Sequence, residues 1–190
     1  DRGQQPLHRP LAGGVAHQVE VRLLPGLQEK VVAGLDLVDE AQVERLVAFM
    51  LKTYGRIDVL INCQGAVALQ PTVDLDIDAW QRVMDVNVKS LVFCCKHVGR
   101  VMLQQGKGKI INISSVRGCQ GRAEDVAYAP SKGAVNQLTH SLAIEWGAKG
   151  IRVNALAPGI TLKANGRWAS ASRVLFSDTI GASSTFIKRS

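Results

Sequence analysis

The sequence has no apolar run that approaches the roughly 20 residues of a membrane-spanning helix. Its first ten residues are polar and lack the apolar stretch of a secretory signal peptide. We therefore expect no membrane association and a cytoplasmic protein. Hydrophobic residues nevertheless make up 46% of the chain, which is typical of a globular protein and argues against wholesale disorder.

Cysteine is scarce, and the four thiols do not form a C-x-x-C pair. No histidine stands at ligand spacing beside Cys63, Cys94, Cys95 or Cys119. This pattern disfavours a zinc site or a redox centre, and we expect no bound metal. Buried thiols are the better interpretation.

Long basic runs and aromatic clusters are also lacking. The net charge is +7, but lysine and arginine are dispersed and aromatic residues amount to only 5%. These features disfavour nucleic-acid binding. A basic surface that attracts an anionic cofactor or substrate is the simpler interpretation.

From about residue 30, predicted strands alternate with predicted helices. Helices are expected between Asp39 and Gly55, over 78–104 and over 127–149, because apolar residues recur there at helical spacing. Short apolar runs predict strands at Val31–Leu37, Ile57–Ile61, Lys109–Ile113 and Ile151–Ala155, with a weaker one at Val19–Leu23. The alternation implies βαβ units, and so a doubly wound α/β fold with a parallel sheet covered on both faces.

The length suits a single domain over residues 1–190. Residues 1–29 form an irregular segment rich in glycine and proline, residues 30–161 an ordered core, and residues 162–190 a tail without clear periodicity. Asp39 has the position of a helix N-cap, with Gln42 three residues on as in a capping box.

Tyr128 and Lys132 are the first candidates for catalysis, because residues four apart on a helix share one face. A phenol has a pKa of about 10 and is a poor base at neutral pH. A neighbouring ammonium lowers that pKa, so the pair suits proton transfer. Taken alone, Y-x-x-x-K more often marks an ordinary tyrosine above a solvated lysine.

Two further polar residues precede this pair. Ser115 stands at the carboxyl end of a predicted strand, where ligands bind in open α/β sheets. Asn87 lies within a mostly apolar helix, where a buried amide is costly unless it is hydrogen-bonded. A structural core asparagine is the alternative for Asn87.

With these motifs in place, the chain resembles the short-chain dehydrogenase/reductase family over about residues 30–161. Each motif is weak alone, but the ordered set is specific. The motifs are Asp36-Leu-Val-Asp, Ile57-Asp-Val-Leu-Ile-Asn-Cys-Gln-Gly65, Asn87, Ile110-Ile-Asn-Ile-Ser-Ser115, Tyr128-x-x-x-Lys132 and Ile151-Arg-Val-Asn-Ala-Leu-Ala-Pro-Gly159.

The resemblance implies four catalytic residues. Tyr128 would exchange a proton with the substrate oxygen, and Lys132 would lower the pKa of the tyrosine and bind the nicotinamide ribose. Ser115 would orient the carbonyl, and Asn87 would hold a water in a relay to Lys132. The activity implied is hydride transfer between NAD or NADP and a small alcohol or carbonyl substrate.

The resemblance also implies residues that bind the cofactor. Asp36, followed by Leu37, would face the adenine, and Asn62 and Gly65 would line the groove. Pro158, Gly159 and Thr161 would meet the nicotinamide, where Tyr128 and Lys132 also lie. A homo-oligomer, either dimer or tetramer, is implied through the two long helices.

The family's glycine-rich phosphate loop is missing from the sequence. Gly13-Gly14 follows no apolar strand, and Gly106-Lys-Gly108 leads into a strand rather than a helix. The family's first strand lies centrally, so without it the strand at Ile57–Ile61 is expected to have an unpaired edge. An inactive relative that acts through oligomer contacts is therefore the alternative to an enzyme.

Overall fold

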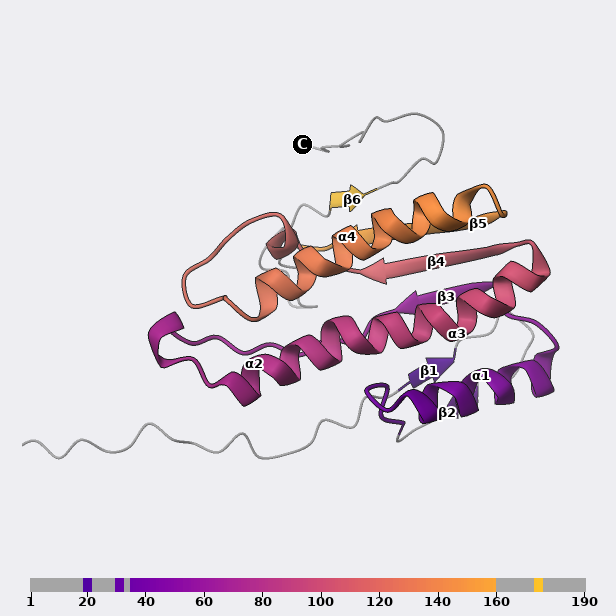
Figure 1. Cartoon of the computed structure of the whole chain (residues 1–190), viewed down its shortest axis with the longest axis horizontal. Helices are drawn as coiled ribbons and strands as arrows, with labels where there is room; N and C mark the ends of the chain where they lie inside the picture. The colour runs from indigo at the N-terminus through magenta and orange to yellow at the C-terminus, as the bar shows by residue number, and fades with distance from the viewer. Residues whose placement is uncertain (1–18, 22–29, 33–34, 160–172, 176–190) are drawn as a thin grey trace, which may run out of the picture. The chain divides into compact units, whose positions relative to one another are not determined.

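The computed structural model describes residues 19–21, 30–32, 35–159 and 173–175 (Figure 1). Contacts divide the chain into two units, Asp1–Asp36 and Leu37–Ser190. The single domain therefore stays a prediction. None of the described helices is long and apolar enough to cross a lipid bilayer.

The first unit contains a two-stranded antiparallel ladder. Strand β1 (Val19–Val21) pairs with β2 (Lys30–Val32), with Glu20 opposite Val31. The weak strand predicted at Val19–Leu23 is thus confirmed at its start. The strand predicted over Val31–Leu37 is wrong at its end, because Leu37 is a buried residue in the turn that opens the second unit.

The second unit is built on a four-stranded sheet with the order β3-β4-β5-β6. Strands β3 (Val59–Asn62), β4 (Gly108–Ile113) and β5 (Ile151–Ala157) are parallel, and β6 (Arg173–Leu175) is antiparallel to β5. The predicted parallel α/β sheet is confirmed. In the described part of the chain β3 ends the sheet, as expected for a strand without its inner neighbour.

Helix α1 (Glu40–Tyr54) begins and ends where the capping residues predict. The Asp39 side chain accepts a hydrogen bond from the Ala41 backbone N–H at 2.9 Å, and Gln42 Nε2 donates to Asp39 Oδ2 at 3.0 Å. Gly55 ends the helix with a φ of 74°, a left-handed conformation that glycine adopts without strain.

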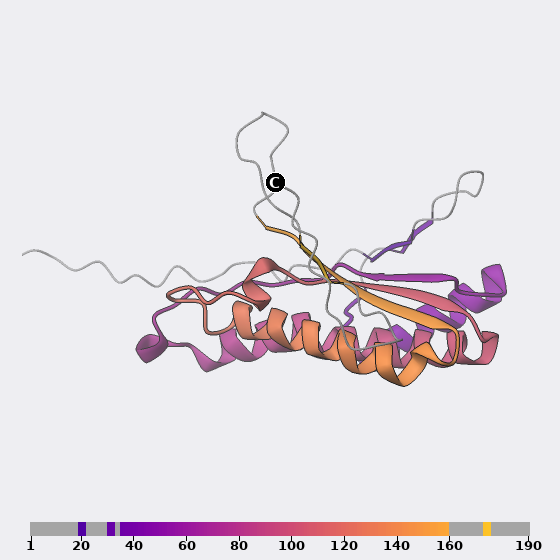
Figure 2. The ribbon, with the colours of Figure 1, turned by 90° about the horizontal axis from the view of Figure 1, so that it is seen from above.

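The helix predicted over 78–104 has an interruption. It consists of α2 (Ile77–Met84), a π turn over Asp85–Lys89 and α3 (Ser90–Gln105). Helix α4 (Tyr128–Gly147) follows β4, after a 3₁₀ turn over Val116–Gly118; another such turn spans Thr72–Asp74. Figure 2 shows α3 and α4 side by side along one face of the parallel strands.

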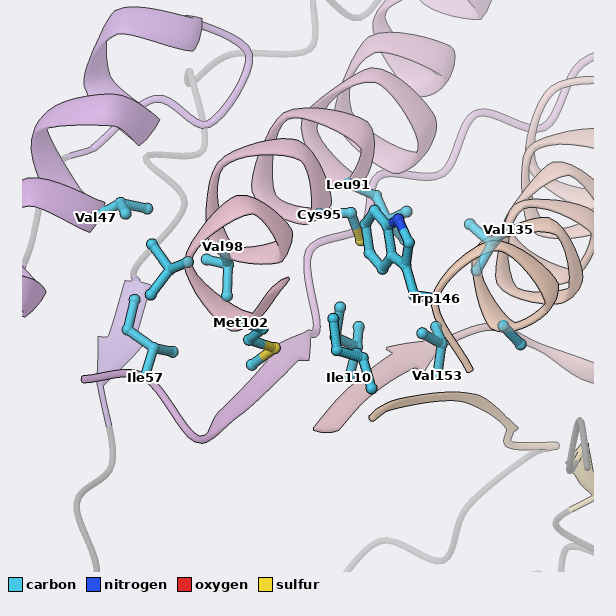
Figure 3. Packing of buried hydrophobic residues seen from close by; sticks show 13 residues of the cluster. Val47, Ile57, Leu91, Cys95, Val98, Met102, Ile110, Val135, Trp146 and Val153 are labelled. Atoms are coloured by element: carbon cyan, nitrogen blue, oxygen red, sulfur yellow. The ribbon is translucent and has the colours of Figure 1, made fainter. Parts of the chain in front are cut away.

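The core lies between these helices and the sheet (Figure 3). Met102 of α3 and Ile110 of β4 are completely buried, and Trp146 of α4 packs into the same cluster. Because this layer fixes α3 and α4 against β4 and β5, it also fixes the loops that follow the strands.

Candidate active site

A pocket of about 290 Å³ opens where the parallel strands end. Its walls come from the loops after β3, β4 and β5 and from the first turn of α4. This is the edge of a parallel sheet at which α/β proteins bind ligands. The lining residues are Cys63, Gln64, Gly65, Val67, Ile113, Ser114, Ser115, Tyr128, Lys132, Pro158 and Gly159.

Tyr128 and Lys132 share one face of α4, as their spacing predicts. Lys132 is only 4% exposed, and its Nζ lies 5.7 Å from the centre of the Tyr128 ring. The same Nζ donates a hydrogen bond to the Ile113 carbonyl at 2.9 Å. Burial lowers the pKa of Lys132 to about 8, and the charge of Cys63 partly opposes this shift.

Ser115 is held at the end of β4 by its own turn. Its Oγ accepts a hydrogen bond from the Arg117 backbone N–H at 3.2 Å and so caps the following 3₁₀ turn. The neighbouring Ser114 Oγ donates to the Lys132 carbonyl at 3.1 Å, which ties the end of β4 to α4. The predicted residues Ser115, Tyr128 and Lys132 are therefore brought together at one pocket.

Asn87 is 1% exposed and does not line the pocket. Its Oδ1 accepts from the Ala66 backbone N–H at 2.7 Å, and its Nδ2 donates to the Ala66 carbonyl at 3.0 Å and to Ser131 Oγ at 2.8 Å. These bonds offset the cost of burying the amide. In the described structure Asn87 supports the loop after Gly65 and the start of α4.

Ser131 is a supporting residue that the Y-x-x-x-K spacing alone does not reveal. It is completely buried, and its Oγ donates to the Tyr128 carbonyl at 2.7 Å while it accepts from Asn87. The only signal in the sequence is a small hydroxyl residue directly before Lys132. Ser131 thus connects Asn87 to the turn that presents Tyr128.

Asn62 lies in the framework behind the pocket. It is 3% exposed, and its Nδ2 donates to Asn112 Oδ1 at 2.8 Å; Asn112 Nδ2 in turn donates to Thr139 Oγ1 at 3.0 Å. This chain of amide and hydroxyl groups links β3, β4 and α4. It keeps the strand ends in register.

The remaining predicted cofactor residues are Asp36, Leu37 and Thr161. Asp36 is exposed at the end of the first unit, and Leu37 is buried at the start of the second. Thr161 lies outside the described residues. The cofactor roles assigned to these residues stay predictions.

The four thiols fall into two pairs. Cys94 and Cys95 on α3 are buried, and burial raises the pKa of each to about 12. Cys63 and Cys119 are exposed, so the expectation of buried thiols is wrong for these two. They differ because they follow β3 and the 3₁₀ turn, on loops rather than on the packed face of a helix.

The comparison with known families agrees with this architecture. A family model described as short chain dehydrogenase matches residues 17–172. The chain belongs to the short-chain dehydrogenase/reductase family.

Several relatives match over the same region. A 2-dehydro-3-deoxy-D-gluconate 5-dehydrogenase of Bacillus subtilis is 46% identical over 58% of this chain and 43% of its own length. A gluconate 5-dehydrogenase from Burkholderia cenocepacia, solved with NADP and tartrate, is 35% identical with a TM-score of 0.65, covering 68% of this chain and 51% of its own. An NAD⁺-bound xylitol dehydrogenase is 35% identical with a TM-score of 0.65, covering 66% and 49%. The chain spans about half the length of the curated relatives it matches.

Proposed function

We propose that this chain acts as an NAD- or NADP-dependent oxidoreductase on a small alcohol or carbonyl compound. The observation that carries the proposal is the pocket that gathers Ser115, Tyr128 and Lys132 at the carboxyl ends of the parallel strands. A hydroxyl, a phenol and a buried amine in one small cavity suit proton transfer to or from a substrate oxygen.

The pocket residues fit the nicotinamide end of such a cofactor. Gln64 lines the pocket, and its buried Nε2 finds no hydrogen-bond partner in the part of the chain that the structure describes. An unpaired buried donor is costly, and an acceptor on a ligand relieves that cost. Gln64, Lys132 and the Pro158-Gly159 backbone would hold the cofactor, which accepts or supplies a hydride when it is bound.

The chain's own residues carry out the proton transfer. The Tyr128 hydroxyl donates a proton to the substrate oxygen in reduction and accepts one in oxidation. Lys132 Nζ lies 5.7 Å from the centre of the Tyr128 ring, close to the group that exchanges the proton. Ser115 Oγ donates a hydrogen bond to the same substrate oxygen. Asn87 and Ser131 hold the turn on which Tyr128 sits.

For the substrate we propose a polyhydroxylated small molecule. The names of the three relatives above refer to gluconate, a deoxygluconate derivative and xylitol. A pocket lined by three hydroxyl side chains, those of Ser114, Ser115 and Tyr128, suits such a compound. The homo-oligomer and the cytoplasmic location stay predictions.

Replacing Tyr128 with phenylalanine tests the chemistry. Tyr128→Phe removes the exchangeable proton and keeps the ring, so turnover of gluconate or xylitol should fall roughly 100-fold or more. The measurement is initial-rate nicotinamide absorbance, with circular dichroism to verify folding. Tyr54→Phe, at the far end of α1, is the matched control and should keep full turnover. Equal turnover in the Tyr128 variant would remove Tyr128 from the proposed mechanism.

A further inference from the structure

Cys119 is an exposed thiol on the turn that carries Ser115. The turn begins immediately after Ser115, and the Cys119 backbone N–H donates to the Val116 carbonyl at 3.1 Å to close it. Cys94 and Cys95 are buried on α3 instead. Cys119 is therefore an exposed cysteine close in sequence to a residue of the candidate active site.

Asn136 makes this thiol different from an ordinary surface cysteine. It lies one helical turn beyond Lys132 on α4 and is only 9% exposed. Its Nδ2 donates to Cys119 Sγ at 3.5 Å. Its Oδ1 is buried and has no hydrogen-bond partner among the described residues, a costly arrangement for an amide oxygen.

The two polar atoms of the Asn136 amide, the donor Nδ2 and the acceptor Oδ1, suit different parts of an oxidised cysteine. The Nδ2 group that donates to the sulfur can also donate to the oxygen of a sulfenic acid, the first oxidation product of cysteine. A sulfenic acid carries a new O–H donor, and Oδ1 is an acceptor without a donor. We propose that Cys119 is a site of reversible oxidation to sulfenic acid, stabilised by the Asn136 amide.

The oxidant is a hydroperoxide. The Cys119 thiolate attacks one peroxide oxygen, a sulfur–oxygen bond forms, and the oxygen–oxygen bond breaks. For hydrogen peroxide the leaving hydroxide takes up a proton to become water. Sulfur is oxidised by two electrons and the peroxide is reduced by two. A thiol reductant restores the cysteine.

The packing of the turn connects this modification to the active site. A Cβ placed on Gly118 would lie 2.7 Å from Asn136 Nδ2 and 2.7 Å from the Lys132 carbonyl oxygen. The turn therefore lies directly on the segment of α4 that carries Lys132, with no spare room. Cys119 directly follows Gly118, so the oxidation site adjoins this tightly packed contact between the Ser115 turn and α4.

The first test uses the full chain with Cys63→Ser, which leaves Cys119 as the exposed cysteine among the four. The protein is treated with hydrogen peroxide in the presence of dimedone, and labelling of the Cys119 peptide is followed by mass spectrometry. Folded protein should be labelled at least about fivefold faster than the same protein in urea. Labelling that is equal or slower in the folded state would overturn the proposal.

The second test changes Asn136. Asn136→Asp keeps the shape of the side chain but replaces the N–H donor with a carboxylate oxygen, so most of the acceleration should disappear. Gln137→Glu is the matched control, because it makes the same chemical change on an adjacent exposed residue and should leave labelling unchanged. Unchanged labelling in a folded Asn136→Asp variant would contradict the role of the amide. If that variant does not fold, the labelling rates of the folded and the urea-unfolded protein in the first test decide whether the proposal holds.

Discussion

Lys132 shows how a single residue can be costly for folding and useful for chemistry. Its amine is buried at the wall of the pocket, and burial lowers its pKa from 10.5 to about 8. The hydrogen bond to the Ile113 carbonyl offsets part of this cost. A residue selected only for stability would not place an ammonium there.

This shift predicts how stability depends on pH. Between about pH 8 and 10.5 the unfolded chain binds more protons at Lys132 than the folded chain does, so stability rises with pH across that window. Lys132→Met should remove this contribution, on the order of 2 kcal/mol over the window. Urea unfolding at both ends of the window measures it. Lys149→Met, at an exposed lysine, is the control. Equal pH dependence of the unfolding free energy in the parent protein and in Lys132→Met would contradict the lowered pKa of Lys132.

The candidate residues also show what can be predicted from spacing. Tyr128 and Lys132 share a helix face because of the period of the helix, and Ser115 lies at a strand end because the apolar run stops there. The hydrogen bonds of Asn62 could not be predicted from the sequence motif that contains it. Strand alternation turns Asn62 to the same side as Leu60, toward Asn112.

At the scale of elements, helix ends were more predictable than helix interiors. Asp39 and Gly55 mark the ends of α1 correctly, because caps are local interactions. The π turn over Asp85–Lys89 has no signal in the apolar periodicity. The turn contains Asn87, which bonds to Ala66 and Ser131, residues distant in sequence, and such turns often occur at functional sites.

The contact between α3 and α4 gives a prediction about packing. A Cβ on Gly99 would lie 2.5 Å from the Trp146 ring, so Gly99→Ala should destabilise the fold by about 1–3 kcal/mol. The higher helix propensity of alanine does not compensate for this overlap. Urea unfolding with circular dichroism measures the change.

Gly133 of α4 provides the matched control for this measurement. A Cβ there would lie 3.6 Å from the Gly118 carbonyl oxygen, an ordinary contact. Gly133→Ala should therefore be neutral or slightly stabilising, because it adds only helix propensity. Equal effects of the two substitutions would show that the Trp146 ring moves aside.

At the scale of the whole molecule, the open edge of the sheet could be predicted from the sequence, but the pairing of β1 with β2 could not. The missing first strand predicts an unpaired edge, and β3 ends the described sheet with Val59 48% and Ile61 54% exposed. The antiparallel β1–β2 pair was not predicted as a pair. Its strands are three residues each, too short for a pairing pattern to be read from the sequence.

The central claim is that the pocket around Tyr128 and Lys132 binds a nicotinamide cofactor. The most direct measurement is a titration of the folded chain with NADH and with NADPH, followed by nicotinamide fluorescence. We expect saturable binding of at least one of them, weakened by Lys132→Met, because Lys132 lines the pocket. No saturable binding of either compound up to millimolar concentration would contradict the claim.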